Sequence, residues 1–344
     1  MPISFDAILQ KSENEEITHD EAVYLFKESE NFGNAQKLFQ AAVNVRDQEI
    51  GRKFQWSGGI ASVLPCTLDP LCSYCPYWVK PSDALSMHEI LTGAKYIMRH
   101  GITNFHLSGG TTLSSDGSDV VSIVEQIRTL TDAELTVNVG AGLSYEALVS
   151  LKDLGVKKVG SSFEVINPKL FSQLKAGDSL EKKKELARQI NDLGLGLGTG
   201  LLAGLNLEPS RYKDYADFIF YIKQFENLDS VYVSRFLPNK GTPMENHPRC
   251  STTEGARIIA IMRLVHRKIN IGPAAGWSYD DIPVWVNAGG GNRIGGIHIS
   301  RVPTYRRPWF LHTALSYEDR MEFCNTIPMA GPMLGEIGIT EVVY

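Results

Sequence analysis

The pattern of hydrophobic and polar positions changes near residue 50. Before that point, apolar residues recur at helical spacing, most clearly between residues 34 and 50, and this predicts helices. Thr18 followed by Glu21 has the form of a capping box at a helix start. We therefore expect residues 1–50 to form a helical extension on the domain that follows.

From residue 54 onward, short apolar runs alternate with amphipathic segments. The apolar runs predict strands over residues 54–64, 104–108, 135–139, 158–163, 196–205, 230–237, 269–271 and 283–287. The amphipathic segments predict helices over residues 86–99, 120–130, 144–154, 179–193, 210–225 and 252–267. Such regular alternation requires a parallel sheet with right-handed crossovers. The count favours an α/β fold of the (β/α)8 TIM-type barrel over residues 51–290.

The pattern is less regular toward the C-terminus. No full helix separates the last two predicted strands, so we expect the barrel to be irregular there. Residues 291–344 contain glycine clusters, a basic stretch (Arg301, Arg306, Arg307) and a predicted helix over residues 316–324. We interpret this segment as a C-terminal extension that completes or closes the barrel.

Composition and charge narrow the class of protein. The chain has 344 residues, of which 43% are hydrophobic and 21% charged, with a net charge of −5; this is ordinary for a globular protein with a large core. The net charge gives no basic surface for nucleic acid, and no apolar run is long enough to cross a bilayer. The N-terminus lacks the pattern of a signal peptide. We expect a cytoplasmic protein without a nucleic-acid or membrane partner.

The most specific feature is a loop that holds three of the five cysteines. Five residues separate Cys66 from Cys72, and two separate Cys72 from Cys75. An odd, local set of cysteines in a long chain indicates a metal site rather than a disulfide framework. Three thiolates suit an iron–sulfur cluster with one open iron, whereas structural zinc usually takes four protein ligands. Zinc and ordinary core or redox cysteines remain alternatives.

The loop follows the first predicted strand, and the C-terminal ends of barrel strands share one mouth. The ends of later strands bring further candidates to this mouth: Ser108, Gly109, Gly110, Asn138, Glu164, Phe236 and Leu237. The helix after the fourth strand carries Lys183 and Arg188, one of which could reach a carboxylate. The glycine pair also fits a tight turn, Glu164 also fits a helix cap, and most of the basic residues also fit a solvated helix face. Position at one mouth groups them as a predicted site.

Together these features resemble the radical SAM superfamily. In that family, a loop of three cysteines follows the first strand of a (β/α) barrel, with an aromatic residue before the third cysteine, here Tyr74. The usual spacing in the family is three residues and then two, so the five-then-two spacing is a departure. The resemblance implies that Cys66, Cys72 and Cys75 bind a [4Fe–4S] cluster whose open iron binds S-adenosyl-L-methionine (SAM).

The resemblance also assigns roles to the other candidates. Residues 108–110 would contact the amino group of the methionine part, Glu164 the methionine or ribose part, and Phe236 with Leu237 the adenine. The SAM carboxylate would meet a basic residue on the fourth helix, either Lys183 or Arg188. The implied partners are a small-molecule substrate and a low-potential electron donor such as ferredoxin or flavodoxin.

The nearest branch resembles biotin synthase, methylornithine synthase and a maturase of [FeFe]-hydrogenase. Within it, the five-then-two spacing resembles the maturases for the iron-guanylylpyridinol cofactor of [Fe]-hydrogenase, which implies formation of the pyridinol precursor. Two alternatives stay open: a radical SAM enzyme on an amino-acid-like substrate, with Arg235 and Asp280 as candidate binding partners, and a zinc-stabilised barrel without redox chemistry.

Overall fold

The computed structural model describes residues 4–79, 83–301 and 315–344. Its centre is a sheet of eight parallel strands in the order β7-β6-β5-β4-β3-β2-β1-β8. The strands are β1 (Lys53–Ile60), β2 (Asn104–Ser108), β3 (Glu134–Asn138), β4 (Lys158–Gly160), β5 (Gly196–Ala203), β6 (Leu228–Arg235), β7 (Asn270–Pro273) and β8 (Arg293–Arg301). The predicted α/β fold with a mostly parallel sheet is confirmed.

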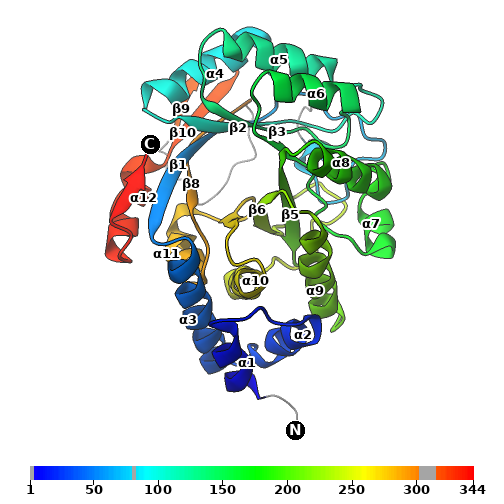
Figure 1. The fold of residues 1–344 in the computed structure, drawn as a ribbon. Helices are drawn as coiled ribbons and strands as arrows, with labels where there is room; N and C mark the ends of the chain where they lie inside the picture. Colours follow the sequence, from blue (N-terminus) through cyan, green and yellow to red (C-terminus); the bar gives the residue numbers. More distant parts are fainter. Residues whose placement is uncertain (1–3, 80–82, 302–314) are drawn as a thin grey trace.

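Helices follow the strands and cover the outside of the sheet (Figure 1). They are α4 (Met87–Arg99), α5 (Ser118–Arg128), α6 (Tyr145–Asp153), α7 (Pro168–Leu174), α8 (Leu180–Asp192), α9 (Arg211–Tyr221) and α10 (Thr252–Val265). Polar side chains start several of them: Ser86 and Glu89 form a capping box on α4, and Ser179 caps α8. All of these except α7 correspond to predicted helices.

The sheet curves toward a barrel, but β7 and β8 are not joined by a strand ladder in the part of the chain that is described. They are linked by one isolated bridge between Ile271 and Gly291. The side chain of Asn270 also accepts hydrogen bonds from the backbone N–H groups of Asn292 and Arg293, at 2.7 and 3.2 Å. The predicted irregularity at the last strands therefore lies at this seam.

Two predictions in the C-terminal third are wrong. The segment predicted as a strand over residues 283–287 is a short helix, α11 (Ile282–Val286), because Pro283 occupies its first turn and suits a helix start. The segment predicted as a helix over residues 316–324 is a hairpin of β9 (Leu315–Glu318) and β10 (Met321–Asn325), turning at Asp319. β10 pairs antiparallel with β8.

The chain ends with α12 (Ile327–Glu336) and β11 (Glu341–Val343), which pairs parallel with the first residues of β1. Of the predicted basic stretch, Arg301 pairs with Asp83 at 2.7 Å, whereas Arg306 and Arg307 lie outside the described residues. The division into units at residues 1–50, 51–290 and 291–344 stays a prediction.

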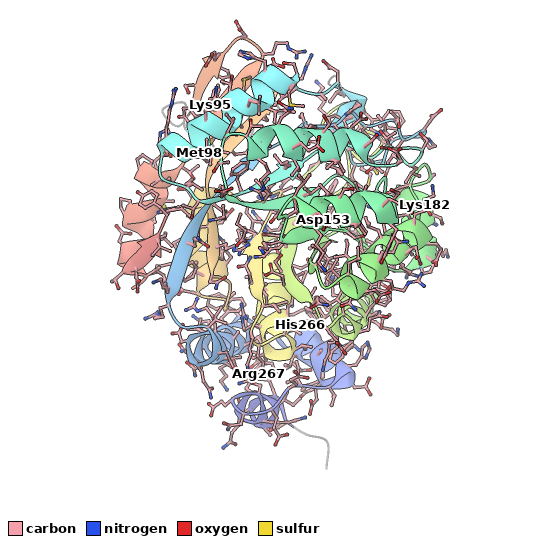
Figure 2. All side chains as sticks on the ribbon, turned by 45° about the horizontal axis from the view of Figure 1, so that its top comes forward. Lys95, Met98, Asp153, Lys182, His266 and Arg267 are labelled. Carbon is pink, nitrogen blue, oxygen red and sulfur yellow. The ribbon has the colours of Figure 1, made fainter. Side chains whose placement is uncertain are left out.

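Three N-terminal helices, α1 (Phe5–Ser12), α2 (His19–Glu28) and α3 (Phe32–Glu49), pack against α9 and α10, as the predicted helical extension requires. Arg267, just beyond α10, faces this layer (Figure 2). Its guanidinium pairs with Glu49 at 2.6 Å and donates to the Ser12 carbonyl at 2.7 Å. None of the helices in the described ranges is long and apolar enough to cross a membrane.

Candidate functional site

The first half of the cysteine loop lies against the end of β2. The Gly110 N–H donates to the Leu64 carbonyl at 2.9 Å, and the Thr67 N–H donates to the Thr111 carbonyl at 3.0 Å. A Cβ on Gly110 would lie 2.3 Å from the backbone nitrogen of Cys66. Glycine is therefore required at position 110 for the close approach of the loop.

The second half of the loop closes on itself and on α7. The Cys75 N–H and the Trp78 indole each donate to the Cys72 carbonyl at 2.9 Å, and the Ser73 N–H donates to the Leu174 carbonyl at 2.8 Å. Residues Pro76–Trp78 form a short 3₁₀ turn. These bonds fix the backbone around Cys72 and Cys75 at the C-terminal end of the strands.

All three loop cysteines are half-buried. Burial raises the pKa of the Cys72 thiol to about 12, although the nearby Lys175 cation opposes that rise. In the described ranges, no three His, Cys, Asp or Glu side chains form a ready-made metal site. The donor set and its placement at the strand ends fit a three-thiolate cluster.

Tyr74, between the second and third cysteines, connects the loop to Glu164. The Tyr74 hydroxyl donates to the Glu164 carboxylate, which also pairs with the Lys175 ammonium. Glu164 has a φ of 65° and makes an isolated bridge to Leu201 of β5. A non-glycine residue in this left-handed region is strained, so the turn that presents Glu164 to the mouth is imposed by its surroundings.

Lys175 and Lys183 share a second carboxylate, that of Asp178. The Lys175–Asp178 and Lys183–Asp178 distances are 3.2 and 3.3 Å, and all three side chains are at most 5% exposed. We refer to Tyr74, Glu164, Lys175, Asp178 and Lys183 as the mouth network.

The charges of the mouth network stabilise one another. Burial alone would raise the pKa of Glu164, but Lys175 and Lys183 outweigh it and hold that pKa below its usual value. Burial would likewise lower the pKa of Lys175, but Glu164 raises it well above normal. The network therefore consists of two carboxylates and two lysines held in place by mutual pairing, with the neutral Tyr74 hydroxyl as a hydrogen-bond donor.

The two predicted carboxylate-binding residues lie in different places. Lys183 is buried in the mouth network, whereas Arg188 is 57% exposed and pairs with Glu185 at 2.9 Å. The structure therefore brings Lys183 to the mouth and leaves Arg188 on the outer face of α8. The neighbouring Lys182 and Lys184 form exposed contacts with the Leu113 carbonyl and Glu181, as expected of a solvated face.

The remaining predicted residues lie along the same edge of the sheet. The Ser108 carbonyl accepts from the Val63 N–H at 3.0 Å, and the Gly109 N–H donates to the Asn138 carbonyl at 3.3 Å. Directly after β6, Phe236 is buried and Leu237 is half-buried. Two residues further on, the Asn239 amide donates to the Tyr74 carbonyl at 3.3 Å. The segment after β6 therefore reaches the cysteine loop.

Sequence analysis did not identify Lys175 or Asp178, and it offered Asn239 only as part of the segment at the sixth strand end. Lys175 and Asp178 follow α7, a helix that was not predicted. The sequence does mark the start of this helix, because Asn167 is its N-cap residue and Pro168 occupies its first turn. Asn239 is notable because its Oδ1 atom is buried without a hydrogen-bond partner, and such an atom is costly unless a ligand or water donates to it.

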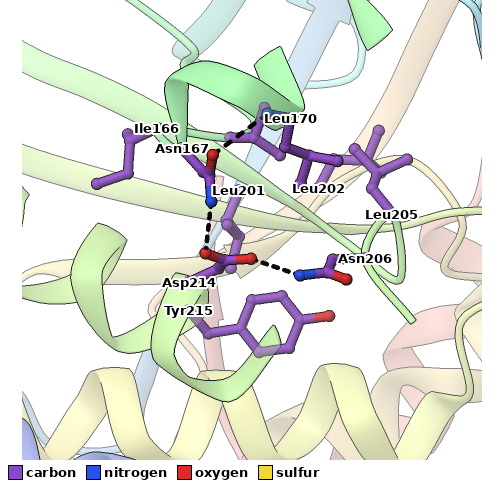
Figure 3. A pocket seen from close by; sticks show the side chains of 10 residues that line it. Ile166, Asn167, Leu170, Leu201, Leu202, Leu205, Asn206, Asp214 and Tyr215 are labelled. Atoms are coloured by element: carbon purple, nitrogen blue, oxygen red, sulfur yellow. Dashed lines mark hydrogen bonds between the residues drawn. The ribbon is translucent and has the colours of Figure 1, made fainter. Parts of the chain in front are cut away.

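Two other features have structural roles. Arg235 pairs with Asp281 at 3.0 Å and stacks on Trp277, so its partner in the fold is Asp281 and not Asp280, the other candidate for binding an amino-acid substrate. A small pocket beside β5 contains Asp214, whose oxygens accept from the amides of Asn167 and Asn206 at 3.0 and 2.6 Å (Figure 3). That carboxylate is satisfied by the fold.

The chain is similar in sequence to one family model and to several known proteins. Residues 65–219 match the family model of the Radical SAM superfamily. The uncharacterized protein MJ0785 of Methanocaldococcus jannaschii is 34% identical over 262 residues, covering 74% of this chain and 68% of the relative. Biotin synthase of Clostridium tetani is 26% identical over 276 residues, covering 76% and 81%.

Solved structures share the fold at lower identity. The crystal structure of methylornithine synthase (PylB) matches with a TM-score of 0.78 and 20% identity, covering 97% of each chain. The [FeFe]-hydrogenase maturase HydG from Carboxydothermus hydrogenoformans matches with a TM-score of 0.74 and 20% identity, covering 86% of this chain and 70% of that one.

Proposed function

The chain belongs to the radical SAM superfamily, and from this premise we propose that Cys66, Cys72 and Cys75 hold its [4Fe–4S] cluster and that the mouth network receives SAM. Members of this superfamily are enzymes that use these two cofactors. What supports the ligand assignment is that the three thiols share one loop at the strand ends, beside a buried set of cations and carboxylates.

The cluster, when bound and reduced, supplies the electron that cleaves SAM into methionine and a 5′-deoxyadenosyl radical. The protein holds and orients SAM. Lys175 and Lys183 offer cations for the SAM carboxylate, and Glu164 offers an acceptor for its amino or ribose hydroxyl groups. The buried Oδ1 of Asn239 would accept a hydrogen bond from the adenine amino group. Ser108, Gly109, Gly110 and Asn138 line the same mouth.

For the pathway, we propose that the chain acts as HmdB (HcgA) does, in forming the pyridinol precursor of the iron-guanylylpyridinol cofactor of [Fe]-hydrogenase. The observation that carries this proposal is the spacing of five and then two residues between the cysteines. The five-residue gap between Cys66 and Cys72 contains Pro70, whose carbonyl oxygen lies 2.3 Å from the position that a Cβ on Gly177 would take. The longer loop is therefore packed against the segment that carries Lys175 and Asp178.

The first test is anaerobic reconstitution with iron and sulfide, followed by reduction in the presence of SAM. The proposal requires 5′-deoxyadenosine and methionine from the wild-type chain and their absence with Cys66→Ala; cleavage by that variant would contradict the ligand assignment. For the pathway, deletion of the gene in its host should abolish [Fe]-hydrogenase activity, and added intact cofactor should restore it. Full activity after deletion would contradict the pathway.

A further inference from the structure

The inner face of the barrel can be identified from side-chain packing on β1 and β8. A Cβ on Gly93 of α4 would lie 3.3 Å from both Ile60 and Ile299, so these two side chains point outward. Side chains alternate along a strand, which places Gly59 and His298 on the inner face. His106 of β2 is aligned with Gly59 and shares that face.

Two histidines therefore flank a glycine on three adjacent strands. The rings of His106 and His298 lie 6.4 Å apart between centroids, with 29° between their planes. A Cβ on Gly59 would lie 2.2 Å from His106 Cε1, so this glycine makes room for the ring. Both histidines keep partial exposure while their strand neighbours Leu107 and Ile299 are fully buried. We call His106 and His298 the histidine wall.

Tyr232 stands on the opposite side of the barrel. It lies on β6, four strands away from β2 in the strand order. In the sheet it is aligned with Gly200 of β5 and Gly272 of β7, neither of which has a side chain to cover it. Tyr232 is half-buried, and burial raises the pKa of its phenol, which therefore stays protonated; its hydroxyl also interacts with the side chains of Ser230 and Asn270.

Charged side chains near the N-terminal ends of the strands are paired with each other. Lys158 contacts Glu134 at 3.1 Å and Asp229 at 3.0 Å, and Arg293 contacts Glu134 at 3.0 Å. Nearer the mouth, Lys175 and Lys183 are paired with Glu164 and Asp178. Because the mouth pairs are assigned to SAM, a second ligand that is zwitterionic would have to break one of the pairs made by Lys158, Glu134, Asp229 and Arg293, whereas an uncharged ligand would not.

We propose that the histidine wall and Tyr232 bind the substrate, and that the substrate is an uncharged molecule with hydroxyl, lactam or N–H groups rather than a zwitterionic amino acid. This inference rests on the proposed radical SAM function and specifies the substrate class of that enzyme. Burial lowers the pKa of His106, and its ring is hydrogen-bonded to the Gly58 backbone. The neutral ring keeps one acceptor nitrogen for a substrate donor, and the Tyr232 hydroxyl supplies a donor for a substrate carbonyl.

The test measures binding apart from catalysis. The reconstituted protein, with SAM and without reductant, is titrated with 2-pyridone, an uncharged ring with one N–H donor and one carbonyl, and separately with L-lysine, using saturation-transfer NMR. We expect saturable binding of 2-pyridone in preference to L-lysine. His106→Gln and His298→Gln should each weaken pyridone binding about five- to tenfold, as expected from the loss of one hydrogen bond.

The matched control is His100→Gln, because His100 lies outside the barrel at the end of α4, beside Tyr96. It should leave binding unchanged, and thermal unfolding shows that each variant is folded. Absence of pyridone binding, preference for L-lysine, or unchanged binding in both wall variants would overturn the inference. Substrate-free cleavage of SAM under reduction is measured in parallel on the wild-type chain and on His100→Gln, and it should occur in both. Its absence in the wild-type chain would contradict the proposed function and not the substrate class.

Discussion

The hydroxyl of Tyr74 donates a hydrogen bond to the carboxylate of Glu164, 90 residues later in the chain. This bond joins the cysteine loop to the turn after β4, and Lys175 extends it into the mouth network. The position of the loop is therefore coupled to the buried charges that we assign to SAM binding. A change in one of these charges should affect both the stability of the fold and the affinity for SAM.

Lys175→Met should test this coupling. The substitution leaves Glu164 without its nearest cation and weakens the pairing of Asp178, so we expect a loss of about 3–5 kcal/mol in the free energy of unfolding and weaker SAM binding. Urea denaturation and equilibrium dialysis with SAM measure the two effects. Arg188→Met is the control, since Arg188 is exposed and outside the network. Equal effects from the two variants would refute the role of Lys175.

Metal analysis should separate the iron–sulfur cluster from the zinc alternative. After anaerobic reconstitution, the wild-type chain should hold iron and sulfide, and Cys66→Ala, Cys72→Ala and Cys75→Ala should each lose most of both. Cys250→Ala should keep them, because Cys250 lies outside the cysteine loop and is buried against Gly204. Zinc without sulfide in the wild-type protein would support the non-redox alternative.

Gly59→Ala should disturb the histidine wall. The added methyl group would meet the His106 ring, and we expect a loss of about 1–3 kcal/mol of stability from this overpacking. Gly295→Ala on neighbouring β8 is the matched control, because nothing lies within 4 Å of its Cβ position. In a double-mutant cycle by urea denaturation, His106→Ala should relieve most of the cost of Gly59→Ala. A purely additive result would show that the two residues do not meet.

The alternation of apolar runs predicted the barrel well, because each strand buries its outer face against a helix. The prediction failed where local signals compete. Pro283 lies in an apolar run that reads as a strand, yet it starts α11, and Val286 of that helix accepts a hydrogen bond from the buried Arg46 of α3 at 2.8 Å. That contact joins residues 240 positions apart, and no local pattern contains it.

The candidate site was predictable to the extent that it depends on strand ends. Cys66, Glu164 and Phe236 follow apolar runs, so topology alone places them at one mouth. Lys175 could not be selected in this way, because it lies after a short helix and differs from an exposed lysine only by its tertiary partners. The same reason left Lys183 and Arg188 indistinguishable in sequence, although the fold buries one and exposes the other.

Arg263 should be essential for the seam between β7 and β8. Its fully buried guanidinium donates to the carbonyls of Gly289 at 2.9 Å and Ile269 at 2.9 Å, and burial lowers its pKa to about 9. Arg263→Met leaves these carbonyls unpaired, and we expect a loss of about 3 kcal/mol or more in urea denaturation. Lys268→Met, which removes an 80% exposed side chain, should change stability by less than about 0.5 kcal/mol. Similar losses in both variants would contradict this role.

His266 should make stability depend on pH. Its ring is buried beyond α10 (Figure 2) and donates from Nε2 to the Ile219 carbonyl at 2.8 Å. Burial lowers its pKa from 6.5 to about 4. Between these values the unfolded chain binds the proton and the folded chain does not. The contribution of His266 is therefore fully present above pH 6.5 and is lost as the pH falls toward 4, by about 3 kcal/mol.

His266→Gln isolates this contribution from that of the carboxylates. Glutamine keeps an amide donor for Ile219 but cannot take up a proton, so the free energy of unfolding of the variant should fall less steeply than that of the wild-type chain between pH 6.5 and 4. His88→Gln, at an exposed position, should retain the wild-type slope. The measurement is urea denaturation at several pH values. Parallel curves for His266→Gln and the wild-type chain would show that the buried imidazole does not set the acid sensitivity.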